Sequence, residues 1–309
     1  MYYLLYPLVW LVSCMPFKVL YLISDFLYVL VYKVIKYRYA VIDDNLRKSF
    51  PEKSEVEIKE IIRQYYAFFC DYLVETMKLC TMSDKQMKER MEFVGVKEMV
   101  QALDQEKKQF AFIYLAHYGN WEWISSLSAR VIDVNPEITG GHIYHPLRNE
   151  AFNRLFLKMR SRFKGINIPM KETLRFIMTQ KRLHKKTIIG FIADQGPKWN
   201  SIHHWLDFMG RRTAVFTGTE TIAKRVDALI FYTHVERVSR GHYRCIIRRM
   251  IDDVTRYPDF QITDMYFRHL EHSLHVQPAI WLWSHKRWKR TYEQYVQLVK
   301  DGVISRDGA

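Results

Sequence analysis

Short apolar segments alternate with longer segments of helical periodicity from about residue 92 onward, and this alternation limits the folds open to the chain. A short apolar run bounded by turn residues predicts a strand, whereas apolar residues at helical spacing predict a helix. Strands that alternate with helices are typical of a largely parallel sheet. The predicted fold class is therefore α/β, with a mixed, largely parallel sheet flanked by helices. The expected strands are residues 92–96, 109–116, 138–144, 187–193, 228–236 and 243–250, and the expected helices are residues 97–107, 121–130, 149–163, 172–181, 217–226 and 260–275.

Residues 1–32 are almost wholly apolar, and Lys18 is their first charged residue. A secretory signal would carry positive residues before the apolar run and small residues at a cleavage site, and neither is present. Two membrane arrangements fit: a spanning helix of about 20 residues, or a helical hairpin within one leaflet, broken near Pro16. A buried pair of helices is the alternative. The cations that follow, from Lys33 to Lys48, predict a cytoplasmic location for the rest of the chain.

Residues 54–80 predict a long amphipathic helix. Ser54 and Glu57 form a capping box, and apolar residues recur behind them at helical spacing. We expect this apolar face to pack against the domain or the membrane surface. The chain is thus divided into a membrane anchor (1–38), an amphipathic helical segment (39–91) and an α/β domain (92–309).

The net charge of +14 on 309 residues favours partners that are anionic: nucleic acid, an acidic membrane face or an acidic protein. The four cysteines are scattered without the paired spacing of a zinc site or a disulfide framework, which fits a reducing compartment. His203 and His204 lack neighbouring cysteines or acids, so we expect no metal there.

The turn that follows the run Phe110–Leu115 carries the strongest chemical signal. The run predicts a buried strand, Gly119 allows a sharp turn, and Asn120 is a candidate helix cap. His117 would then lie at the strand end, with Glu122 in the first helical turn. A carboxylate there can orient the imidazole, which can take a proton at neutral pH. A structural histidine beside aromatic residues is the alternative. A zinc-binding helix would need a second histidine on the same face.

Polar residues also follow two other predicted strands. Asp194 and Gln195 end one of them, where they can either line a pocket or cap a turn. His145 and Arg148 end another, and the helix beyond them is rich in cations, including Arg160. Such a helix is either a solvated face or a phosphate-binding surface. The run 281–290 interleaves aromatic and cationic residues, as at a lipid headgroup boundary or a nucleic-acid surface.

Together these motifs resemble the bacterial lipid A late acyltransferases (lauroyl and myristoyl transferases) of the lysophospholipid acyltransferase superfamily, from the N-terminus to about residue 290. His117 and Glu122 match the family's catalytic pair of a histidine, four residues and an acid. Further matching segments are Arg160-Ser161, Asp194-Gln195, 214–220 and 285–289. His145 departs from the pattern, because relatives often have arginine there.

The resemblance implies an O-acyltransferase that moves a fatty acyl group from a thioester, carried by acyl carrier protein or coenzyme A, to a hydroxyl of a lipid A precursor. It implies His117 as general base, oriented by Glu122, and no cofactor or metal. It also implies the bacterial inner membrane as location, with the catalytic domain on the cytoplasmic side. The substrate-binding residues expected from these motifs are Asn120, Arg148, Arg160, Asp194, Gln195 and His145.

Two alternatives remain open from the sequence. The acceptor of the same reaction could be a lysophospholipid or an amino-acid lipid. The protein could instead bind anionic lipid without catalysis. Nucleic-acid binding explains neither the apolar N-terminus nor the histidine turn, so it is disfavoured.

Overall fold

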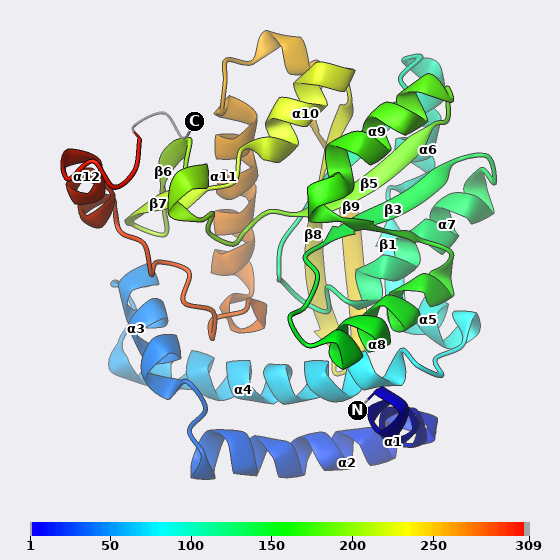
Figure 1. The fold of residues 1–309 in the computed structure, drawn as a ribbon. Helices are drawn as coiled ribbons and strands as arrows, with labels where there is room; N and C mark the ends of the chain where they lie inside the picture. The colour runs from blue at the N-terminus through cyan, green and yellow to red at the C-terminus, as the bar shows by residue number, and fades with distance from the viewer. Residues whose placement is uncertain (1, 306–309) are drawn as a thin grey trace.

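A seven-stranded sheet forms the centre of the molecule in the computed structural model, which describes residues 2–305 (Figure 1). The strand order is β1-β9-β8-β2-β5-β3-β4, and neighbouring strands are parallel except for the antiparallel pair β8 and β9. The mixed, largely parallel sheet expected from the sequence is therefore confirmed. The strands are β1 (Met91–Val94), β2 (Phe110–Leu115), β3 (Thr139–Tyr144), β4 (Ile166–Pro169), β5 (Thr187–Ile192), β8 (Leu229–Ser239) and β9 (His242–Ile251).

Three strands were not predicted. The edge strand β4 has only four residues and ends in proline, so it lacks a clear apolar run. The other two, β6 (His204–Phe208) and β7 (Arg211–Val215), form an antiparallel hairpin outside the main sheet. Its turn residues Met209 and Gly210 both have positive φ, as the tightest hairpin turns require. Methionine is a rare choice for such a position, so the turn carried no sequence signal.

Helices cover both faces of the sheet. In β2, Ile113 and Leu115 face the side of α7 (Leu127–Val134), whereas the ring of Tyr114 stacks on Tyr266 of α11 (Gln261–Val276) with ring centroids 4.7 Å apart. Because successive strand residues point to opposite faces, α7 and α11 lie on opposite sides of the sheet. The helices of this part are α6 (Val96–Gln105), α7 (Leu127–Val134), α8 (Glu150–Arg160), α9 (Thr173–Arg182), α10 (Gly218–Val226), α11 (Gln261–Val276) and α12 (Tyr292–Lys300).

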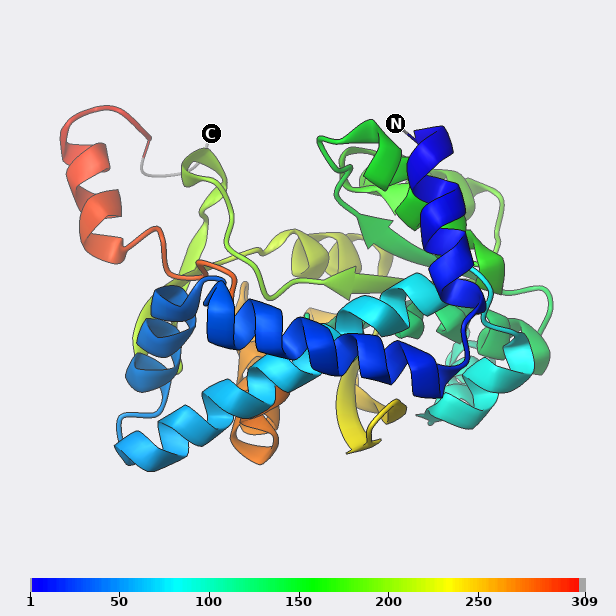
Figure 2. The same cartoon turned by 90° about the horizontal axis from the view of Figure 1, so that it is seen from below.

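The N-terminal third is helical, and α4 (Glu55–Lys78) runs beneath the sheet with α2 (Phe17–Tyr28) alongside it (Figure 2). The predicted capping box at Ser54 and Glu57 is confirmed. Within residues 2–305, no single helix has the length and apolarity to cross a membrane. The helices Tyr2–Cys14 and Phe17–Val34 have that length and apolarity only as a pair, and the pair is bent by 115°. The anchor and the three-part division of the chain stay predictions. The remaining elements are α1 (Tyr2–Cys14), α2 (Phe17–Tyr28), a π-helix (Val29–Val34), α3 (Tyr39–Ser49) and α5 (Asp84–Arg90).

Gly119 is expected to tolerate no side chain. Its φ is +64°, and a Cβ atom there would lie 2.5 Å from Cγ1 of Val235. Gly119→Ala should therefore lower the free energy of unfolding by about 1–2 kcal/mol through left-handed strain, and by about 1–3 kcal/mol more through overpacking. Chemical unfolding would measure the loss. Gly210→Ala is the matched control, because Gly210 has φ +71° but no atom within 4 Å of the added carbon; equal losses in the two variants would contradict the overpacking argument.

Candidate active site

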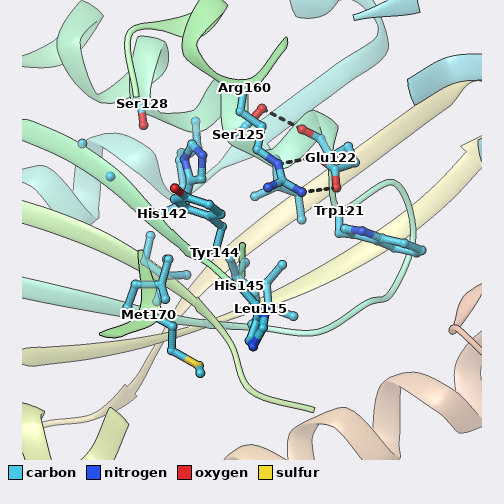
Figure 3. A pocket seen from close by; sticks show the side chains of 18 of the residues that line it. Leu115, Trp121, Glu122, Ser125, Ser128, His142, Tyr144, His145, Arg160 and Met170 are labelled. Carbon is cyan, nitrogen blue, oxygen red and sulfur yellow. Dashed lines mark hydrogen bonds and ion pairs between the residues drawn. The ribbon is translucent and has the colours of Figure 1, made fainter. Parts of the chain in front are cut away.

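Alternate residues of three neighbouring strands form one wall of a cavity. Ile113 of β2 pairs with Gly190 of β5, and Gly190 pairs with His142 of β3, so these three positions face the same side of the sheet. The cavity, of about 470 Å³, lies between this wall and residues 121–131, with Arg160 of α8 beside Glu122 (Figure 3). Gly190 lines the cavity, and a side chain there would collide with the wall, because a Cβ atom would come within 2.9 Å of a methyl group of Leu115. The apolar inner wall suits a hydrocarbon chain.

His117 lines this cavity just beyond the end of β2. Its Nδ1 lies 2.7 Å from Oδ1 of Asp194, and its backbone N–H donates to Oδ2 of the same carboxylate at 3.1 Å. Asp194 is buried, follows the end of β5, and also accepts a hydrogen bond from Nε1 of Trp281 at 2.8 Å. Burial acts to raise the pKa of the Asp194 carboxyl, but the charge of His117 and these hydrogen bonds together hold it below its usual value.

An ionised Asp194 can only accept hydrogen bonds, so Nδ1 of His117 carries a proton and its N–H donates a hydrogen bond to the carboxylate. In the neutral imidazole, Nε2 is then left with a free lone pair. His117 is thus arranged as a proton acceptor at the cavity, oriented by an aspartate from the neighbouring strand.

Glu122 makes no hydrogen bond to His117, so the structure does not support the expectation that it orients the imidazole. Its carboxylate binds the guanidinium of Arg160 instead, with Nε–Oε2 at 2.8 Å and Nη2–Oε1 at 2.6 Å. The reason is local: a 3-10 turn (Trp123–Ser126) precedes α7, so Glu122 faces α8 across the cavity wall (Figure 3). Asp194 reaches the imidazole because the carboxyl ends of β2 and β5 lie side by side.

The other predicted site residues fall into two groups. Gln195 and His145 both line the cavity, and Nε2 of Gln195 lies 3.3 Å from Nε2 of His117. Asn120 is buried behind the site: its amide donates to Glu75 at 2.8 Å and its oxygen accepts from the Trp123 N–H at 3.1 Å. Arg148 is exposed and outside the cavity wall. The structure thus gives Asn120 a structural place, and a substrate contact by Arg148 stays a prediction.

Two supporting residues were missed by the sequence interpretation. Trp281 belongs to a run interpreted as a lipid headgroup or nucleic-acid surface, but Trp281, Trp283 and Arg287 are buried. Their interleaved pattern therefore marks the packing behind Asp194, and that expectation is corrected. Glu75 of α4 is also fully buried and accepts from Asn120 and the hydroxyl of Tyr243. Burial raises the pKa of Glu75. A carboxylate inside an amphipathic helix gave no sign of this role.

Across residues 2–305, no cluster of histidine, cysteine, aspartate or glutamate side chains is arranged to hold a metal ion. His204, which follows His203 in a predicted loop, starts β6, and its Nε2 pairs with Asp264 at 2.7 Å.

The comparison with protein families decides the class of enzyme. A model described as bacterial lipid A biosynthesis acyltransferase matches residues 1–290. The chain belongs to this family. A search of curated proteins found no match. As a member of the family the protein is an acyltransferase, which confirms the resemblance noted from its motifs and agrees with transfer to oxygen. Members of such a family use an acyl thioester as donor and a lipid A precursor as acceptor in general terms.

Proposed function

We propose that the protein transfers a fatty acyl group from the thioester of acyl carrier protein to a hydroxyl of a lipid A precursor, with His117 as general base and Asp194 as the residue that orients it. The observation that carries this proposal is the pairing of His117 Nδ1 with Asp194 at 2.7 Å beside a largely apolar cavity. The pairing supports a base with its Nε2 lone pair free, and the cavity supports a hydrocarbon substrate.

In the proposed reaction, side chains of the protein carry out every proton transfer between the two substrates. His117 Nε2 takes the proton of the acceptor hydroxyl as its oxygen bonds to the thioester carbonyl carbon. The carbonyl electrons move to oxygen, and they return as the carbon–sulfur bond breaks. The departing thiolate then takes the proton from Nε2. A positioned base of this kind contributes about 10²–10⁴ in rate.

The charge of the chain supports the choice of donor. The net charge of +14 favours association with an acidic carrier protein by long-range attraction. Coenzyme A carries the same thioester and is the competing donor.

The N-terminal helices support a membrane location. Apolar side chains of α1 and α2 are exposed, among them Leu4, Leu8, Leu11, Leu22 and Phe26. Exposed apolar groups in such number favour contact with lipid. We place the enzyme at the cytoplasmic face of the bacterial inner membrane, where the acceptor lipid and the carrier protein can both reach it.

The test is an acyl-transfer assay on detergent-purified protein, with product masses measured by mass spectrometry. A tetra-acylated lipid A precursor, a lysophospholipid and an amino-acid lipid are each offered with acyl–acyl carrier protein or acyl–coenzyme A. We expect the lipid A precursor to gain one acyl mass, most rapidly from the carrier protein, and no gain with His117→Ala. Acylation of only another acceptor would reassign the substrate, and no transfer to any acceptor would contradict the proposal.

A further inference from the structure

The amide of Gln195 is hydrogen-bonded to Nε2 of His117, the atom that must accept the proton in the proposed reaction. Asp194 binds Nδ1 of His117, so the lone pair of the imidazole is on Nε2, and Nε2 of Gln195 lies 3.3 Å from it. Since the lone pair can only accept, the Gln195 amide donates to it. In this arrangement the base is capped, and an acceptor hydroxyl can reach His117 only after Gln195 has moved.

The Gln195 side chain is held lightly. Across residues 2–305 the structure gives it no other hydrogen-bond partner, and it is only half-buried at the cavity. Its backbone is firmly placed by contrast, because the preceding Asp194 is bound by His117 and Trp281. Displacement of the amide therefore costs one hydrogen bond and leaves the loop in place.

Several other donors near the cavity are already in use. The backbone N–H of His117 binds Asp194, and that of Gly119 donates to the carbonyl of Ile280 at 2.9 Å. Arg160 directs Nε and Nη2 to Glu122. The carbonyl oxygen of the thioester becomes negative during attack and needs a donor close to the base. The displaced Gln195 amide is such a donor and remains within reach of the reacting atoms.

We propose that Gln195 is a further catalytic residue: it caps the Nε2 lone pair of His117 in the free enzyme and donates to the oxyanion once the acceptor hydroxyl has displaced it. The oxyanion role rests on the proposed acyl transfer, whereas the cap is a property of the free enzyme. In the reaction the acceptor proton goes to His117, the oxygen–carbon bond forms, and the carbonyl electron pair rests on the oxygen that Gln195 binds. The carbon–sulfur bond then breaks and the proton passes to the thiolate.

Gln195→Met tests both roles, because methionine has a similar length and shape but cannot donate. In the transfer assay we expect kcat to fall by about 10²–10³-fold, as for loss of one oxyanion donor, with little change in KM for the acceptor. In the free enzyme we expect the reactivity of His117 to rise. Diethyl pyrocarbonate should modify His117 faster at fixed pH, as measured by peptide mass spectrometry, because Nε2 is no longer covered by the Gln195 amide. A residue with a merely structural role would not raise the reactivity of the base while lowering turnover.

Two references make the outcomes separable. The exposed His184 is the internal standard for the modification rate, and Asn200→Ala removes an exposed amide from the same loop without touching His117. Unchanged kcat in Gln195→Met would overturn the oxyanion role, and an unchanged modification rate of His117 would overturn the cap. If wild type transferred no acyl group, the proposed function would fail, yet the modification experiment would still decide the cap. For both experiments, a circular dichroism spectrum of Gln195→Met identical to that of wild type shows that the variant is folded.

Discussion

Asp194→Asn is expected to lower kcat by about 10³–10⁴-fold while the protein stays folded. An asparagine fills the same space, but its amide can donate to Nδ1 and so favours the imidazole tautomer with the proton on Nε2, the atom that must accept. In enzymes whose catalytic histidine is oriented by an aspartate, replacing that aspartate by asparagine lowers kcat by about 10⁴-fold. Steady-state transfer assays at fixed pH measure the effect, with His117→Ala as the reference for loss of the base.

Glu122→Gln is the matched control, since it also replaces one buried carboxylate close to the active site by an amide. Glu122 binds Arg160 rather than His117, so its effect on kcat should be much smaller than that of Asp194→Asn. If Glu122→Gln proved the more damaging change and Asp194→Asn were nearly wild type, the assignment of the orienting carboxylate to Asp194 would be wrong.

Arg160→Ala is expected to lower the free energy of unfolding by about 3–5 kcal/mol. The Glu122 side chain is only 5% exposed and the Arg160 side chain 21% exposed, so removal of the cation leaves a buried carboxylate without its partner. Urea unfolding of the detergent-purified protein would give the change.

The double substitution Glu122→Leu with Arg160→Met separates loss of the pair from loss of one partner. Replacing both charges by apolar groups removes the need to solvate either, so the double variant should be more stable than Arg160→Ala alone. A double variant that is less stable than the single one would show that the pair itself, and not the unpaired carboxylate, dominates the stability of this wall.

The architecture could be predicted from the sequence because burial decides where apolar residues lie along each strand and helix. The run Phe110–Leu115 is apolar throughout, as a strand covered on both faces must be, and it became β2. Ser54 and Glu57 lie three residues apart, and their hydrogen bonds form within one helical turn. Elements without such local signals were missed: β4 is short, and the turn of the β6–β7 hairpin uses a methionine at positive φ.

The α/β fold, the family and the choice of His117 as the candidate base could therefore be predicted from the sequence, because each strand, helix and motif that indicated them is formed by residues close together along the chain. Tertiary structure alone decided the partner of the imidazole. Asp194 is 77 residues away, and it reaches His117 because two parallel strands end at the same edge of the sheet. It also decided that Glu122 binds Arg160 and that Trp281 supports Asp194. Spacing along a chain predicts contacts only within a turn or a helix, and these contacts are made between elements.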